Sequence, residues 1–309
     1  MADSATTTSE AAGSSGQALY RRFRAQTFSQ IVGQDAVVQT LRNAVRLDRL
    51  GHGFLFVGPR GTGKTSMARI LAKAVNCTDR HDGEPCDACP SCTAIRECRA
   101  LDVIELDAAS NNKVDDMREL VPRVYTGAAD LARKVFIIDE AHMLSNAAWN
   151  ALLKTLEEPT PATVFVIVAE TEDDLPETVS SRCRTVVLGR VSEPEGAAGL
   201  TGLGIDEQQA TEAARIAGGR PGLALALATE PQVADYRRLW LSIPMRLGEH
   251  PGDAFRLADE TMAAAEPLLV ALKERQQEER HALGDDAPKS LRDRQTRELK
   301  RATDALYVT

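Results

Sequence analysis

The residues best suited to chemistry lie in one short stretch, Gly58-Pro-Arg-Gly-Thr-Gly-Lys64-Thr65. Its spacing fits the phosphate-binding pattern G-x-x-x-x-G-K-S/T, in which glycines let backbone N–H groups turn toward a triphosphate. Lys64 can reach the β and γ oxygens, and the Thr65 hydroxyl can ligate Mg²⁺. An apolar run at 54–57 precedes the stretch and a helical pattern at 66–75 follows it, which favours a nucleotide site over a chance glycine-rich turn. The predicted nucleotide-binding residues are Gly58, Pro59, Arg60, Gly61, Thr62, Gly63, Lys64, Thr65 and Ser66.

Two carboxylates follow the apolar run at 135–138 and supply what the phosphate-binding loop lacks. Side chains at the carboxyl end of a buried strand emerge where open α/β sheets bind their ligands. Asp139 is therefore predicted to join Thr65 around Mg²⁺, and Glu140 to polarise an attacking water. The other interpretation, a pair of ordinary loop carboxylates, is weakened by the upstream loop. For the nearby His142, a structural hydrogen bond is as good an interpretation as a functional role.

Four cysteines form a compact cluster of potential metal ligands: Cys77, Cys86, Cys89 and Cys92. Their two C-x-x-C steps let neighbouring thiolates share one tetrahedral ion, and a zinc site closed by four cysteines is structural rather than catalytic. An iron–sulfur cluster is the main alternative, because soft thiolates suit both. Cys98 and Cys183 are interpreted as idle thiols.

Arg182 stands in a Ser-Arg-Cys triplet that follows a short helical pattern at 175–179. An arginine at a helix end is often a plain surface residue. In a phosphate-loop ATPase, however, a fixed guanidinium stabilises charge on the transferred phosphoryl group. If Arg182 does not reach its own nucleotide, it must serve the nucleotide of a neighbouring subunit.

Apolar runs alternate with helical patterns through the first two thirds of the chain, which is typical of a parallel sheet between helices and indicates the α/β class. The strands are predicted at 54–57, 103–106, 134–138 and 164–168. The helices are predicted at 35–45, capped by Asp35, then at 114–124, 150–156 and 175–179, the last capped by Asp173 or Asp174. After residue 191 only helices are expected, at 207–217, 223–229, 234–247 and 251–274.

The pattern divides the chain into four parts. Residues 1–18 are rich in Ser, Thr, Ala and Gly and are predicted to be a disordered tail. Residues 19–190 form a nucleotide-binding domain with a zinc insert at 77–92. Residues 191–232 are predicted to form a small helical lid domain. Residues 233–309 are predicted to form a helical collar for oligomerisation that is either compact or truncated at the chain end.

Composition excludes two classes of protein. With 309 residues and 43% hydrophobic content the chain is large enough for two or three domains. Its net charge of -8 and 4% aromatic content argue against a free-standing binder of DNA. No apolar run approaches the length of a membrane span and no leader segment is evident, so the protein is expected to be cytoplasmic, without a membrane partner.

Taken together, these motifs resemble the AAA+ ATPases of the bacterial DNA polymerase III clamp loader, most closely the gamma/tau type. The resemblance covers residues 19–190 and includes the stretches 20–34, 105–110 and 152–159. It implies a P-loop AAA+ core that binds ATP, Mg²⁺ and structural Zn²⁺ and works in a hetero-pentameric ring with other clamp-loader subunits. The ring would open the sliding clamp and place it on primer–template DNA during DNA replication. The resemblance also makes Tyr20, Arg24 and Val32 candidate neighbours of the adenosine, and Arg182 an arginine finger that acts in trans.

Two departures from the family pattern affect which of the family's residue roles can be assigned to this chain. The family places a threonine sensor just after the fourth strand, where this chain has Ala169-Glu170 with Thr171 offset by one position. Arg220 lies near the position of the second sensor, yet its surroundings, Gly219-Arg-Pro-Gly222, resemble the delta prime subunit. The alternatives are therefore a delta prime-like stator that does not hydrolyse ATP, or another AAA+ remodeller. Intact Lys64 and Glu140 favour the ATPase, and the cysteine insert argues against the generic remodeller.

Overall fold

The computed structural model describes residues 24–109, 111–112, 114–248, 250–283, 295–296 and 299. The chain divides into two compact units, one of residues Arg24–Ala224 and one that includes Leu225–Thr309. Each unit is described by itself. The tail predicted at 1–18 and the candidate adenosine neighbour Tyr20 lie outside the described residues.

A parallel sheet forms the centre of the first unit, with strand order β2-β3-β4-β1-β5 in the described chain. The strands are β1 Gly53–Val57, β2 Val103–Asp107, β3 Lys134–Asp139, β4 Thr163–Ala169 and β5 Arg184–Val187. The first four confirm the sequence prediction. The fifth was missed, because it is a four-residue strand at the sheet edge whose first and last residues are exposed, so it lacks the long apolar run of a central strand.

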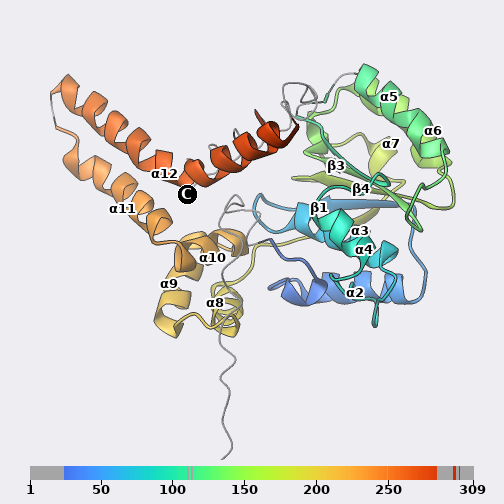
Figure 1. Cartoon of the computed structure of the whole chain (residues 1–309), viewed down its shortest axis with the longest axis horizontal. Helices are drawn as coiled ribbons and strands as arrows, with labels where there is room; N and C mark the ends of the chain where they lie inside the picture. The colour runs from blue at the N-terminus through green and yellow to red at the C-terminus, as the bar shows by residue number, and fades with distance from the viewer. Residues whose placement is uncertain are drawn as a thin grey trace, which may run out of the picture. The chain divides into compact units, whose positions relative to one another are not determined.

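Helices cover both faces of this sheet (Figure 1). One face carries α2 Asp35–Arg46, α3 Lys64–Asn76 and α4 Pro90–Arg96; the other carries α5 Val114–Tyr125, α6 Asn146–Glu157 and α7 Glu177–Ser180. The chain up to residue 229 also contains two short 3-10 turns, Phe28–Gln30 and Ala141–Met143. Three further helices follow the sheet: α8 Glu193–Gly202, α9 Glu207–Ala217 and α10 Pro221–Thr229. The three-layer α/β prediction is confirmed.

The core consists of two apolar layers, one on each side of the sheet, and alternate residues of each strand enter alternate layers. In β1, Phe54 and Phe56 pack with α2, α3 and α4, whereas Leu55 and Val57 pack toward α5, α6 and α7. Successive side chains of a strand point to opposite faces, so a strand buried on both faces must be apolar throughout. All five residues of β1 are buried.

Helix starts differ from the prediction in three places. Asp35 is the first residue of α2 rather than its cap, which is Gln34. The cap of α7 is Pro176, and neither Asp173 nor Asp174 fills that position, because the Asp174 carboxylate accepts a hydrogen bond from the Thr171 amide instead. The unpredicted helix α8 begins with a capping box of Ser192 and Glu195, a short local signal that its Gly-rich interior obscured.

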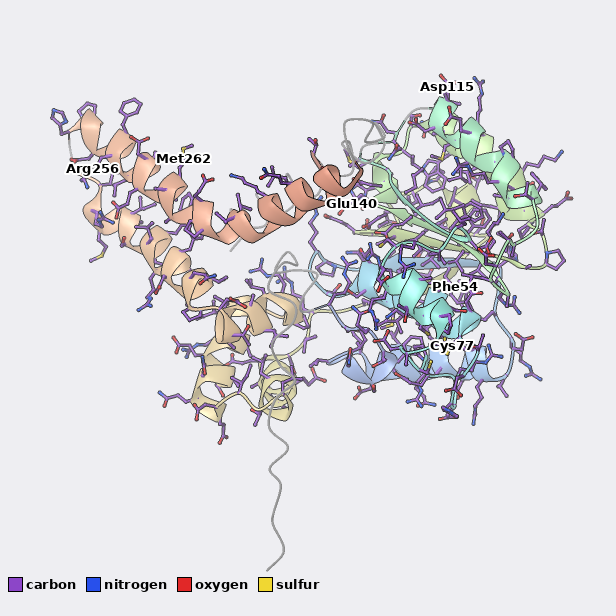
Figure 2. The ribbon with its side chains drawn as sticks, in the orientation of Figure 1. Phe54, Cys77, Asp115, Glu140, Arg256 and Met262 are labelled. Atoms are coloured by element: carbon purple, nitrogen blue, oxygen red, sulfur yellow. The ribbon has the colours of Figure 1, made fainter. Side chains whose placement is uncertain are left out.

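The second unit contains two long helices, α11 Pro231–Arg246 and α12 Pro251–Leu283. Both start within a few residues of their predicted positions, and α12 runs farther than predicted. Large apolar side chains on them are exposed, including Met245, Phe255 and Met262. Figure 2 labels Met262 on α12. Among the described helices, none combines the length and the apolar character that a bilayer crossing requires.

Asp102 anchors the loop that leads into β3. Its side chain is almost fully buried, and its carboxylate accepts hydrogen bonds from the backbone amides of Ala129, Asp130 and Leu131 at 2.8–3.0 Å. Burial, the largest single effect, would raise the pKa of Asp102, but the three amides together outweigh it and hold the pKa below its ordinary value. The carboxylate therefore stabilises the folded chain in its ionised form.

We expect Asp102→Asn to lower the free energy of unfolding at pH 7 by about 1–3 kcal/mol, because a buried amide cannot accept all three hydrogen bonds. Urea unfolding measures this. The native pKa is depressed, so the contribution is present above about pH 4, the unfolded pKa, and is lost as the pH falls through the native value. The difference between wild type and variant should shrink there. Asp130→Asn, at an exposed carboxylate in the same loop, is the matched control, and an equal effect of both variants would contradict the assignment.

Candidate nucleotide-binding site

The phosphate-binding loop connects β1 to α3, and its backbone requires glycine at particular positions. Gly58 passes so close to β5 that an added Cβ would lie 2.0 Å from the Leu188 carbonyl oxygen. Gly63 precedes α3 with a φ of 98° and offers no side chain to cap it. The first N–H groups of α3 are therefore left for an outside acceptor, and the helix dipole favours an anion there.

Lys64 and Thr65 are the first two residues of α3. The Lys64 ammonium donates hydrogen bonds to the carbonyl oxygens of Gly58 and Pro59, the latter at 3.0 Å, which holds the loop closed on itself. Burial lowers the pKa of Lys64, partly offset by the nearby carboxylates of Glu140 and Asp139. A partly desolvated ammonium beside exposed amide groups suits a phosphate oxygen.

Thr65 and Asp139 bring the loop and the acidic strand end together. The Thr65 hydroxyl lies 3.1 Å from an Asp139 carboxylate oxygen, although 74 residues separate them. Adjacent ligands of an octahedral Mg²⁺ lie about 3 Å apart, given metal–oxygen distances of 2.0–2.1 Å, so the two oxygens fit one coordination shell. The other Asp139 oxygen accepts the Glu140 amide at 3.0 Å, which fixes the carboxylate.

Glu140 lies at the rim of this site in a strained backbone conformation. Its φ of 52° is in the left-handed region, which costs a residue with a side chain about 1–2 kcal/mol. The turn directs the chain from β3 into the 3-10 segment that carries His142, whose Nε2 lies 3.4 Å from a Glu140 carboxylate oxygen. The structure thus gives His142 a contact with Glu140, and leaves its role open.

Arg60 and Glu170 form a contact that the sequence did not predict. Arg60 was expected among the phosphate-binding residues, but its guanidinium binds Glu170 at 2.7 Å and Glu140 at 3.2 Å. Glu170 comes directly after β4, much as Asp139 comes at the end of β3. The sequence pattern that predicted Asp139, a carboxylate at the end of an apolar strand, was therefore present at Glu170 too. In the sequence, position 170 had stood out only because the related family has a threonine there.

The four predicted metal ligands lie together at the end of α3 and the start of α4; Figure 2 labels Cys77 among them. Their sulfur atoms all lie within 4.8 Å of one another, and that of Cys77 lies 3.5 Å from Cys86 and 3.9 Å from Cys89. Four sulfurs at 2.3 Å from one tetrahedral ion would be about 3.8 Å apart, so the cluster fits a single ion.

Neither remaining cysteine belongs to this cluster. Cys98 is exposed, and Cys183 is partly buried next to β1, where burial raises its pKa to about 11 and keeps it a neutral thiol. The cysteine-containing segment 77–92 contacts the core through Asp87, whose carboxylate accepts a 2.6 Å hydrogen bond from the buried ammonium of Lys73 on α3. The insert is thereby fixed to the helix that follows the phosphate-binding loop.

Arg182 lies at the opposite edge of the sheet from the phosphate-binding loop. An added Cβ on Gly53, the first residue of β1, would come within 3.2 Å of the Arg182 carbonyl oxygen. The five residues of β1 separate this point from the loop by about 16 Å, at about 3.3 Å per residue. The Arg182 guanidinium instead binds the Thr178 carbonyl at 2.6 Å and the Glu157 carboxylate at 2.5 Å.

The other predicted ligand-binding residues have distinct surroundings within the first unit. The aliphatic part of Arg220 packs on the loop, since an added Cβ on Gly61 would lie 2.9 Å from its Cγ. Burial and Arg190 lower the pKa of Arg220. Val32 packs against Gly199 of α8, and the Arg24 carbonyl accepts a hydrogen bond from Gln26. Their roles at a nucleotide stay predictions.

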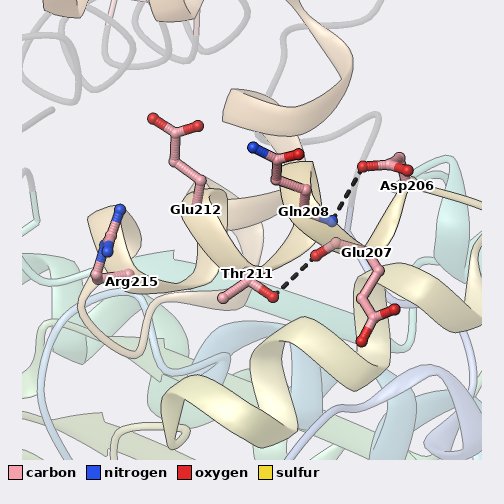
Figure 3. A pocket seen from close by; sticks show the side chains of 6 residues that line it. All are labelled: Asp206, Glu207, Gln208, Thr211, Glu212 and Arg215. Carbon is pink, nitrogen blue, oxygen red and sulfur yellow. Dashed lines mark hydrogen bonds between the residues drawn. The ribbon is translucent and has the colours of Figure 1, made fainter.

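A hollow elsewhere in the first unit lies on the outer side of α9 (Figure 3). It is lined by Asp206, Glu207, Gln208, Thr211, Glu212 and Arg215. Its polar groups are engaged locally: Asp206 accepts the Gln208 amide at 3.0 Å, and Thr211 donates to the Glu207 carbonyl at 2.8 Å. These contacts are those of a capped helix start, and none of the predicted site residues lines the hollow.

The chain is similar in sequence to several DNA polymerase III subunits. It is 48% identical over 176 residues to subunit tau of Bacillus subtilis, covering 57% of this chain and 31% of the relative. It is 47% identical over 167 residues to subunit tau of Escherichia coli, covering 54% and 26%. For subunit gamma of Buchnera aphidicola subsp. Acyrthosiphon pisum the identity is 44% over 177 residues, covering 57% and 49%. The chain thus matches less than half the length of each relative.

Among solved structures, a variant of RuvB from Thermotoga maritima superimposes with a TM-score of 0.50 at 19% sequence identity, covering 71% of this chain and 67% of that chain. At this identity the likeness concerns the fold alone, and it agrees with the α/β prediction for the first unit.

A family model described as DNA polymerase III, delta subunit, matches residues 33–192, which is more than half of the chain. The match includes the phosphate-binding loop, the cysteine cluster, Asp139 with Glu140, and Arg182. The relatives confirm the resemblance to gamma/tau subunits noted in the sequence, and the chain belongs to this family of DNA polymerase III subunits.

Proposed function

We propose that the chain is an ATP-hydrolysing subunit of a DNA polymerase III clamp loader, which loads the sliding clamp onto primed DNA. One observation carries the proposal: the Thr65 hydroxyl at the start of α3, which follows β1, and the Asp139 carboxylate at the end of β3 lie 3.1 Å apart beside Lys64, although β1 and β3 are not adjacent. The relatives named gamma and tau support the cellular role.

In the proposed reaction the protein mainly positions and neutralises charge. The loop amides and Lys64 would hold the phosphates of ATP, and Thr65 and Asp139 would hold Mg²⁺. Bound Mg²⁺ supplies neutralisation of the charge that develops on the phosphate oxygens. Glu140 orients a water for attack on the terminal phosphate. Arg220, packed on the loop, contacts the phosphates from the lid helices.

The proposed assembly follows from the placement of Arg182. Since about 16 Å of β1 separates Arg182 from its own loop, its guanidinium stabilises the transferred phosphoryl group of a neighbouring subunit, and its own site receives an arginine from another. Exposed apolar side chains of α11 and α12, such as Met245 and Phe255, support a contact with other clamp-loader subunits. Primer–template DNA and the sliding clamp are the partners of the ring.

The alternative of a delta prime-like stator is disfavoured by the complete set of Lys64, Thr65, Asp139 and Glu140. A stator has no need for two acidic groups placed beside a phosphate-binding loop. Binding of ATP to the isolated chain separates the two functions.

We expect Mg·ATP at 100 times its Kd to raise the free energy of unfolding by about 2.7 kcal/mol, because ligand that binds only the folded state stabilises it by mass action. Lys64→Ala should abolish this gain, since the phosphates lose their ammonium partner. Thermal unfolding with and without Mg·ATP measures it, and Lys273→Ala, at a lysine of α12 in an ion pair with Glu266, is the control. A wild-type chain without stabilisation would identify a stator.

Arg182→Ala should leave the Kd of the variant for ATP unchanged and slow hydrolysis in the assembled ring by about 10-fold or more, given the size of arginine-finger effects. Rings that mix variant subunits show whether Arg182 acts on its own nucleotide or on that of a neighbour. A subunit with Lys64→Ala but intact Arg182 should still support hydrolysis by its neighbour. Arg184→Ala, at an exposed arginine of β5, is the matched control. Loss of ATP binding by the Arg182 variant would contradict action in trans.

Zinc is the proposed ion of the cysteine cluster. Purified protein should contain about one equivalent of zinc, and Cys92→Ser should lose it and unfold at lower temperature, because a structural site stabilises the folded state. Cys98→Ser, outside the cluster, should change neither. Elemental analysis with thermal unfolding measures both, and iron with visible absorbance would refute zinc.

A further inference from the structure

Glu170 occupies a central place in the nucleotide site because of the strand order. Strand β4 lies between β3, which leads to Glu140, and β1, which leads to the phosphate-binding loop. The register pairs Val57 with Ala169, so the residues that follow, Gly58 and Glu170, leave the sheet side by side. The Gly58 amide donates to the Glu170 carbonyl oxygen at 2.9 Å. Glu170 is therefore joined to the loop through its backbone.

The Glu170 side chain makes a second connection to the loop through Arg60. The Arg60 Nε lies 2.7 Å from Glu170 Oε1, and a terminal nitrogen of the same guanidinium lies 3.2 Å from Glu140 Oε2. A planar guanidinium presents several donors in a fixed arrangement, so one side chain can hold two carboxylates at once. The Arg60 side chain is 71% exposed, and therefore these two ion pairs, rather than packing, set its direction.

The charges around Glu140 explain why a cation is needed between the Glu140 and Glu170 carboxylates. Carboxylate oxygens of Glu140 and Glu170 and a nitrogen of His142 all lie within 4.8 Å of one another. Two carboxylates at that separation repel each other unless a cation lies beside them. Lys64 also lies near Glu140, but its ammonium donates its hydrogen bonds to the carbonyl oxygens of Gly58 and Pro59, whereas Arg60 contacts both carboxylates directly.

We propose that Arg60 and Glu170 are positioning residues for hydrolysis: Glu170 fixes the Arg60 guanidinium, and Arg60 fixes the Glu140 carboxylate against the phosphate-binding loop. The inference rests on the proposed ATPase function. It assigns the side chain of Arg60 to the water-activating carboxylate rather than to a phosphate. It also gives Glu170 a role that does not require contact with the nucleotide.

Steady-state ATP hydrolysis and ATP binding by the assembled subunit test this chain of contacts. Arg60→Ala and Glu170→Ala should each lower kcat by about 10-fold, the size expected for a displaced catalytic group, while the Kd for ATP stays within about two-fold. The double variant should be no slower than the slower single variant, because both changes break the same connection. Arg60→Lys should recover only part of the rate, since a compact ammonium does not reproduce the planar arrangement of donors by which the guanidinium contacts both carboxylates.

Arg118→Ala is the matched control, since Arg118 forms an exposed ion pair with Asp115 at 3.1 Å on α5. It should leave kcat unchanged. Rate losses of Arg60→Ala and Glu170→Ala that multiply in the double variant would overturn the inference. Weaker binding of ATP with an unchanged kcat would also overturn it, because that result would place Arg60 on the phosphates. A faster Arg60→Ala variant would overturn it as well, because the ion pairs would then inhibit hydrolysis.

A readout without hydrolysis separates this inference from the proposed function. In the nucleotide-free chain the Nε–H resonance of Arg60 should shift and exchange faster with water in Glu170→Ala than in wild type, because its acceptor is gone. An unchanged resonance would refute the Arg60–Glu170 pairing even in an active enzyme. A ring that hydrolyses no ATP while the resonance responds would refute the ATPase proposal and leave the pairing supported.

Discussion

The nucleotide site depends on one topological constraint: strands β1, β3 and β4 are parallel and adjacent in the order β3-β4-β1. Parallel strands present their carboxyl ends at one edge, so three loops that are far apart in the sequence must emerge together. Burial of all three strands on both faces fixes their register, because a shift by one residue would exchange the two apolar layers. The 3.1 Å approach of Thr65 to Asp139 follows from this packing.

The same constraint places Arg182 away from its own site. It precedes β5, which runs parallel to β1, so the first residue of β5 pairs with Phe54 and its last pairs with Val57. A side chain before the strand and a loop after the neighbouring strand are then separated by the length of the sheet. Hydrolysis that needs both Arg182 and the phosphate-binding loop requires a second subunit.

The sequence predicted the elements whose signal is local. The phosphate-binding loop, Asp139 with Glu140, and the four cysteines each depend on spacing within a few residues, and β1 to β4 each carry a continuous apolar run. Strand β5 and helix α8 were missed because neither carries a strong apolar pattern, and Asp35 is not a cap because Gln34 already occupies that position. Ion pairs between distant loops, such as Arg60 with Glu170, depend on the strand order and leave no local pattern.

The pairing of Arg60 also limits what motif matching can transfer. A residue inside a phosphate-binding pattern is assigned to the phosphate only if its side chain has no stronger partner, and a carboxylate 2.7 Å away is such a partner. Glu170 stands where the family pattern places a threonine, and an uncompensated carboxylate there would repel the nucleotide. In the proposed arrangement, the Arg60 guanidinium neutralises the carboxylate that Glu170 adds at this position.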